Sequence, residues 1–107
     1  MSVKGGMGGM MKQAQRLQGQ IQKLQAELNE REFEASSGGG AVVAVVNGRQ
    51  QLLEIRIDRE VVDPNDVESL QDLVLAAVNN ALELSQSIVE AEVGKVTGGL
   101  NIPGLFG

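Results

Sequence analysis

The stretch AVVAVVNGRQQLLEIRI, residues 41–57, decides the fold of this chain of 107 residues. Residues 41–46 form an apolar run, and the Asn47-Gly48 pair after it is a strong sequence signal for a β-hairpin. Residues 50–57 return with alternating polarity, as expected for a strand with one buried face. One face of that strand carries Leu53, Ile55 and Ile57, and the other carries Glu54 and Arg56. The stretch therefore predicts two antiparallel strands joined at Asn47-Gly48.

The run of residues 41–46 is apolar on both faces of its strand, and small Ala41 and Ala44 permit close approach. An antiparallel sheet commonly exposes one face to water. The run therefore predicts either a helix on each face, or a helix on one face and a second subunit on the other. Because short chains often complete their core with a second subunit, we predict a homodimer. The candidate interface residues are Val43, Val45, Leu70 and Val74.

Two further patterns extend the hairpin to a three-stranded sheet. Residues 31–37 alternate polar and apolar side chains, which predicts a strand before the hairpin. Gly38-Gly39-Gly40 then interrupts the pattern. Because neither a Lys-Ser/Thr pair nor a helix follows these glycines, they indicate a turn and not a phosphate-binding loop.

Long helical patterns flank the sheet. Between Met10 and Leu28, apolar residues recur at spacings of four and three, which is an a/d seam held for nearly three heptads. This helix either packs on its own sheet alone or also meets a partner helix. The Asp-Pro-Asn-Asp sequence at residues 63–66 predicts the start of a second helix, which runs to about Val93 and ends at Gly94. Its apolar stripe is wider than one packing surface needs, which favours burial against both the sheet and a partner.

These elements predict one α+β domain in the order α-β-β-β-α, with a three-stranded antiparallel sheet between long N-terminal and C-terminal helices. The folded domain is expected to span residues 10–94. Residues 1–9, rich in glycine and methionine, are expected to form a flexible N-terminus. Residues 95–107 are expected to form a flexible C-terminal tail, although their apolar side chains could dock elsewhere.

The composition argues against catalytic chemistry. The chain has no cysteine and no histidine, so thiolate metal sites and histidine general bases are absent. Its only aromatic residues, Phe33 and Phe106, are too few for the stacking surfaces of most single-strand nucleic-acid binders. We predict no enzyme activity, no metal and no small-molecule cofactor. No apolar run of about 18 residues is present and no secretory signal is recognisable, so we expect a cytoplasmic protein without a membrane partner.

Charge is distributed unevenly along the chain. The net charge is −5, which by itself opposes binding to nucleic acid. Residues 1–26 nevertheless carry four bases and no acid, whereas residues 27–107 carry five bases and fourteen acids. A basic end on an acidic body is typical of an interaction arm.

The bases of the first helix form a narrow stripe. At 3.6 residues per turn, Lys12, Arg16 and Lys23 fall within about 40° of one another, on the face turned away from the apolar seam. Gly19 lies on the same stripe and permits close backbone approach. Flanking glutamines can donate hydrogen bonds to phosphate oxygens. The candidate DNA-binding residues are therefore Lys12, Arg16, Lys23, Gln13 and Gln20, although spacing alone also fits an ordinary solvated face.

The lengths of the elements predict that this basic segment projects. A helix of about 24 residues is about 36 Å long, whereas a strand of about seven residues is about 23 Å long. The sheet follows the helix closely in sequence, so the overhanging end is expected to be the N-terminal, basic half. A dimer would present two such arms.

Six short motifs follow one another along the chain. They are MMKQAQRLQ at residues 10–18, VVNG at 45–48, ID at 57–58, VDP at 62–64, LQDLVLAAVNNA at 70–81 and LNIPG at 100–104. In this order and spacing they resemble the YbaB/EbfC family of nucleoid-associated DNA-binding proteins, over nearly the whole chain from Lys4 onward. The resemblance implies a tweezer-like homodimer that binds DNA with low or modest sequence specificity in the bacterial nucleoid. It also implies that protruding basic helices contact the DNA, which corresponds here to Lys12, Arg16 and Lys23.

Two functions follow from these patterns. The first is a nucleoid-associated protein that binds duplex DNA as a homodimer through its basic N-terminal helices. The alternative is a dimeric protein-interaction adaptor for a nucleic-acid-processing complex, with little direct DNA binding, in which the acidic body and the apolar tail make the contacts.

Overall fold

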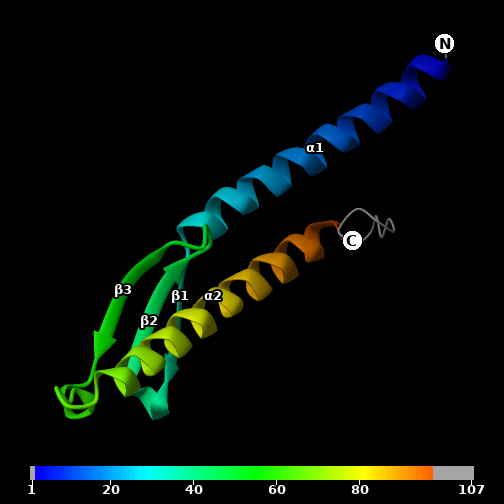
Figure 1. Ribbon diagram of the computed structural model, residues 1–107. Coiled ribbons are helices and arrows are strands. Elements are labelled where there is room, and N and C mark those ends of the chain that lie inside the picture. The colour runs from blue at the N-terminus through cyan, green and yellow to red at the C-terminus, as the bar shows by residue number, and fades with distance from the viewer. Residues whose placement is uncertain (1, 98–107) are drawn as a thin grey trace.

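The hairpin is the centre of the fold in the computed structural model, which describes residues 2–97 (Figure 1). Strand β2 spans Val42–Asn47 and pairs antiparallel with β3, Leu52–Ile57. The hairpin prediction is thus confirmed, but the second strand begins at Leu52 and not at residue 50. The reason lies in the Asn47 side chain, whose Oδ1 accepts hydrogen bonds from the backbone N–H groups of Arg49 and Gln51, at 2.9 and 3.1 Å. In the resulting loop the backbone of Gln50 adopts the left-handed conformation, with a φ of 66°.

The sheet has three antiparallel strands in the order β1-β2-β3, as predicted. Strand β1 spans Glu32–Ser37 and pairs with β2. The glycines at residues 38–40 form the turn between these strands, all three with positive φ. At Gly38 a Cβ atom would lie 2.7 Å from the Cδ2 atom of Leu73, so both the backbone conformation and the space require glycine there.

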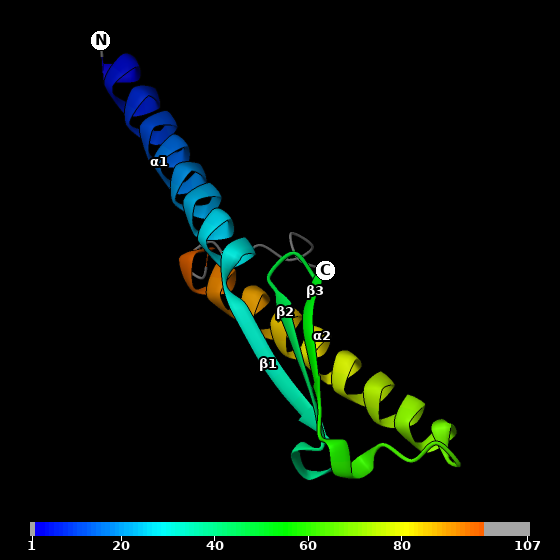
Figure 2. The ribbon, with the colours of Figure 1, turned by 90° about the vertical axis from the view of Figure 1, so that its left-hand side faces the viewer.

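Helix α2, Val67–Thr97, covers one face of β1 and β2 (Figures 1 and 2). The small side chains of Ala77 and Ala81 let the helix approach the sheet closely, and both are fully buried. Ser85, also fully buried, donates a hydrogen bond to the carbonyl oxygen of Asn47 at 2.9 Å and accepts one from Gln50 Nε2 at 2.9 Å. The helix therefore holds the β2–β3 loop as well as the sheet. The core that results consists of Phe33, Val42, Ala44, Val46, Ala77 and Ala81.

The ends of α2 differ in part from the sequence prediction. Asp66 is the residue that caps the helix, because its carboxylate accepts hydrogen bonds from the backbone N–H and the hydroxyl of Ser69, at 3.3 and 2.6 Å. Pro64 lies in the turn before the helix. The prediction that Gly94 ends the helix is wrong, since α2 continues to Thr97. A glycine inside a helix costs only about 1 kcal/mol relative to alanine, and a Lys95–Glu92 ion pair at 3.1 Å spans this turn.

Helix α1, Ser2–Glu30, joins the sheet only at its C-terminal end (Figure 2). It begins at Ser2, well before the start near Met10 that the apolar spacing predicts. Leu28 is buried, whereas the helix toward its N-terminus extends beyond the sheet. The molecule is elongated as a result, with extents of 79 × 24 × 16 Å. The predicted overhang of the N-terminal half of this helix is confirmed.

Candidate nucleic-acid interface and dimer surface

The three bases of the predicted stripe lie on the part of α1 that projects from the sheet, which we call the arm. Lys12, Arg16 and Lys23 are all exposed, and within residues 2–97 no ion pair joins any of them to an acidic side chain. About 16 Å separates the first and last of them along the helix. The stripe is therefore a row of positive charges that is free to meet an anionic surface.

The two candidate glutamines lie in different surroundings. Gln20 is exposed. Gln13 lies at the rim of an apolar groove on α1, beside Met10 and Ala14, so it is placed between the basic stripe and the apolar seam. A Cβ atom on Gly19 would meet nothing within 4 Å, which leaves the helix surface open at the centre of the stripe.

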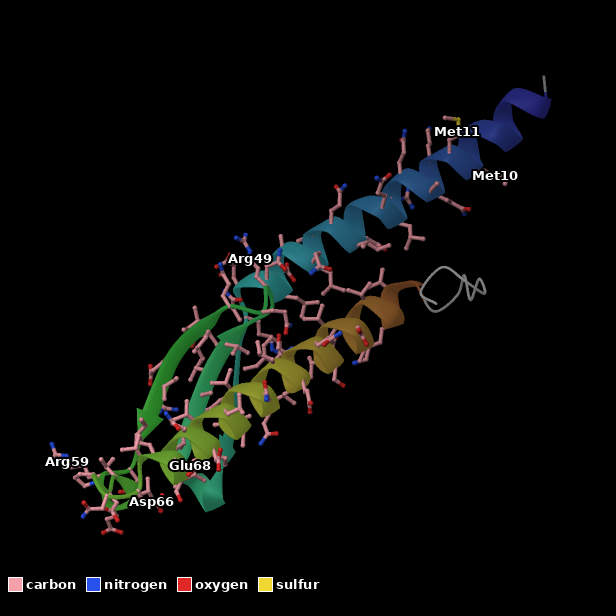
Figure 3. The ribbon with its side chains drawn as sticks, viewed as in Figure 1. Met10, Met11, Arg49, Arg59, Asp66 and Glu68 are labelled. Atoms are coloured by element: carbon pink, nitrogen blue, oxygen red, sulfur yellow. The ribbon has the colours of Figure 1, made fainter. Side chains whose placement is uncertain are left out.

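The stripe ends where α1 reaches the sheet. Glu27 and Glu30 reverse its sign, and Glu30 pairs with Arg49 of the β2–β3 loop at 3.4 Å. Figure 3 shows Arg49 at this junction, with Met10 and Met11 much farther out on the helix. The free positive charge of α1 is thus confined to the projecting arm, and the acidic body begins at the sheet.

The apolar seam of α1 becomes more exposed with distance from the sheet. Leu28 is 4% exposed, Ile21 and Leu17 are half-buried, and Met10 is 73% exposed. On the arm this seam forms an open groove lined by Met10, Ala14, Leu17 and Ile21, with Gln13, Gln18 and Gln22 at the rim. We call this surface the arm groove.

The candidate interface residues fall on two different surfaces. Val43 and Val45 lie on the face of β2 that points away from α2, whereas Leu70 and Val74 lie on α2. Val45 is already buried in the single chain, at 8% exposure. Its neighbours in register are Glu34 and Glu54, and Arg56 pairs with both of these carboxylates. Charged side chains thus lie around Val45 on this face of β2.

Sequence reasoning missed the exposed apolar face of β3. All six residues of this strand are exposed, because α2 lies over β1 and β2 and leaves β3 beside it (Figure 1). The register pairs Ile57 with Val42 and Ile55 with Ala44, so these side chains share the face on which α2 packs. A register shift at Val45/Val46 makes Leu52, and not Leu53, the third member of this face. The alternating polarity of residues 50–57 predicts an apolar face on this strand. It does not reveal that α2 leaves this face uncovered.

A second open groove lies on α2. It is lined by Leu70, Gln71, Val74, Leu75 and Val78, and Leu75 is 61% exposed. Together with Leu52, Ile55 and Ile57 these residues form what we call the β3–α2 surface. Two of the four candidate interface residues, Leu70 and Val74, belong to it.

The polar side chains on the described surface can form ion pairs and hydrogen bonds. Within residues 2–97 no group of three His, Cys, Asp or Glu side chains is placed to hold a metal ion. The hydrogen bonds from Ser69 hold the pKa of Asp66 below its ordinary value of 3.8, which is the effect of a helix cap. Over the same residues, neither helix is long and apolar enough to cross a membrane.

Comparisons with known proteins agree with the fold and identify the family. A model of the YbaB/EbfC DNA-binding family matches residues 4–100. A nucleoid-associated protein of Alkaliphilus metalliredigens is 54% identical, over 99% of this chain and all of its own length. One from Clostridium novyi is also 54% identical, over 94% of each chain. The crystal structure of an uncharacterised Helicobacter pylori protein, 20% identical, has the same fold with a TM-score of 0.64, covering 83% of this chain and 90% of its own.

Proposed function

The chain belongs to the YbaB/EbfC DNA-binding family, and on that premise we propose that it binds duplex DNA as a homodimer through the basic stripe of α1. That family is described by DNA binding and its members by association with the nucleoid, not by a catalysed reaction. The proposed site of action is accordingly the nucleoid in the cytoplasm of a bacterium.

The observation that carries this proposal is the unpaired basic stripe on a projecting helix. Lys12, Arg16 and Lys23 have no acidic partner within residues 2–97 and are therefore available to phosphates. Lysine and arginine contacts to phosphates supply most sequence-independent affinity for DNA. Gln20, and Gln13 at the edge of the stripe, add hydrogen bonds to phosphate oxygens.

Low sequence specificity follows from the kind of contact. Phosphate contacts position a protein on the duplex but do not read its sequence. The acidic body, with fourteen acids in residues 27–107, repels DNA and restricts contact to the arms.

Dimerisation doubles the number of arms. The β3–α2 surface supports this part of the proposal, because its apolar side chains lie on a sheet face and a helix that no other described element covers. Exposed apolar patches are typical of protein–protein interfaces. In this arrangement a second copy covers Ile55 and Leu75. The other two predicted interface residues, Val43 and Val45, lie on the opposite face of the sheet.

The test is fluorescence anisotropy on two unrelated duplexes over a range of salt concentrations. Three bases per chain give six per dimer, so the slope of log affinity against log salt should be no steeper than about −5, at about −0.9 per neutralised phosphate. Replacing Lys12, Arg16 and Lys23 together with glutamine should abolish this slope and weaken binding to both duplexes equally.

A control variant removes the same charge elsewhere. Changing Arg59 and Lys95 to glutamine and Asn65 to aspartate also lowers the net charge by three, but none of these residues lies on the arm, and Figure 3 shows Arg59 at the opposite end of the molecule. This control should retain most of the parent affinity. Equal loss in both variants would mean that overall charge and not the arm determines binding. If the unmodified protein fails to bind even at low salt, the adaptor function replaces the one proposed here.

A further inference from the structure

The arm groove has no partner within the described part of the chain. Its apolar residues, Met10, Ala14, Leu17 and Ile21, continue outward the line on which Leu28 is buried. Figure 3 shows Met10 far out on α1, on the side where α2 ends. The groove is thus an extension of the surface along which α1 already packs.

The composition of the arm indicates that it needs a packing partner. Gly8, Gly9 and Gly19 lie within it, and glycine is among the weakest helix formers. Most helical stability in proteins comes from packing of an apolar face and not from the helix propensity of the residues. A segment that covers the groove would therefore stabilise the helix that carries the basic stripe.

Helix α2 leads directly toward the arm groove. Gln25 of α1 and Glu90, Val93 and Gly94 of α2 line one pocket, so the two helices lie side by side there, and they run in opposite directions (Figure 1). Helix α2 continues for one further turn, to Thr97. The chain consequently leaves α2 near the end of the groove that Ile21 forms.

We propose that residues 98–107 of the same chain dock in the arm groove. These residues read GGLNIPGLFG and contain four large apolar side chains and no charge. Ten extended residues span about 33 Å, whereas Met10 and Ile21 are about 16 Å apart along the helix. The segment is therefore long enough to cross from α2 and cover the groove.

The competing occupant is the α1 helix of a second copy. Residues 98–107 follow α2 directly in the same chain, so they reach the groove at a high effective concentration, whereas a second arm must come from another molecule. Docking of these residues leaves the stripe of Lys12, Arg16 and Lys23 exposed, because the stripe lies on the face away from the groove. This consequence for DNA rests on the proposed function, but docking itself does not.

Because the chain has no cysteine, a pair of introduced cysteines can test the proposal without DNA. Oxidation of the double variant Gln18→Cys/Asn101→Cys is expected to form a disulfide within one chain, seen as loss of free thiols at monomer mass on a non-reducing gel. A covalent dimer from Gln18→Cys alone would show that a second copy occupies the groove. A covalent dimer formed only by the double variant would place the segment on the other subunit. Either result overturns docking within one chain.

Hydrogen exchange provides a second measurement on the full chain. In the variant Ile102→Ser/Phe106→Ser, amides of residues 10–21 should exchange about tenfold faster or more, while those of β2 stay protected. The control Asn101→Ser changes a polar residue of the same segment and should leave exchange unchanged. Equal protection of the arm in all three proteins would overturn the proposal. Since neither measurement involves DNA, failure of docking is distinguishable from failure of DNA binding.

Discussion

The carbonyl oxygen of Leu28 lies where a side chain at position 48 would have to be placed. A Cβ atom on Gly48 would stand 2.0 Å from that oxygen and 2.6 Å from the carbonyl carbon. The last turns of α1 and the β2–β3 loop therefore meet backbone against backbone, and the Glu30–Arg49 pair spans the same junction. This contact sets the direction in which the basic arm leaves the sheet.

Replacing Gly48 with alanine should destabilise the protein by about 1–3 kcal/mol, because the added methyl group must displace the backbone of α1. Urea unfolding followed by circular dichroism measures the loss. Gly19→Ala is the control, since nothing lies within 4 Å of its Cβ position, and alanine should stabilise this helix by about 0.5–1 kcal/mol. Equal stabilities of Gly48→Ala and the parent would show that the junction can relax without cost.

Two aspartate substitutions should separate folding from dimerisation. Ile55→Asp places a charge on the exposed β3–α2 surface and should yield a folded monomer in sedimentation equilibrium, with its circular dichroism spectrum retained. Val45→Asp places a buried carboxylate between Glu34 and Glu54, which already share Arg56, so it should cost at least about 3 kcal/mol of folding stability. A folded monomer at micromolar concentration for the unmodified chain would contradict the homodimer. A stable Ile55→Asp dimer would place the interface elsewhere.

Capping of α2 by Asp66 should make stability depend on pH in the acid range. Hydrogen bonds from Ser69 lower the pKa of this carboxyl below 3.8, so the carboxylate contributes stability that is fully present above about pH 4 and is lost as the pH falls through its lowered pKa. Asp66→Asn keeps a good cap but cannot titrate, and its Tm should change less between pH 7 and pH 3 than that of the parent. The same acid-induced decrease in Tm in both proteins would show that other carboxyls cause it.

Treatment with a chelator should leave both the Tm and the oligomeric state unchanged. The reason is the absence of histidine and cysteine from the chain, together with the absence of a three-ligand cluster within residues 2–97. The measurement is thermal unfolding before and after EDTA, followed by addition of zinc or magnesium. A decrease in Tm that one metal reverses would reveal a site formed by carboxylates of two subunits.

The sequence by itself determined the elements, their order and the chemistry of the arm. Strands and helices follow from periods of 2 and 3.6 residues, which depend only on which side chains are apolar. The narrow stripe of Lys12, Arg16 and Lys23 is likewise a property of spacing on one helix. The ordered motifs were enough to indicate the family, which the comparison over residues 4–100 confirms.

Only the tertiary structure decided which apolar faces are covered. The sequence predicts that β2 is apolar on both sides, but the screening of Val45 by Arg56 depends on the register that places Glu34 and Glu54 on either side of it. The open face of β3 depends on where α2 crosses the sheet, and Gly48 is required by the backbone of Leu28, twenty residues earlier. Each of these facts concerns atoms that are distant in sequence, and a local pattern carries no information about such contacts.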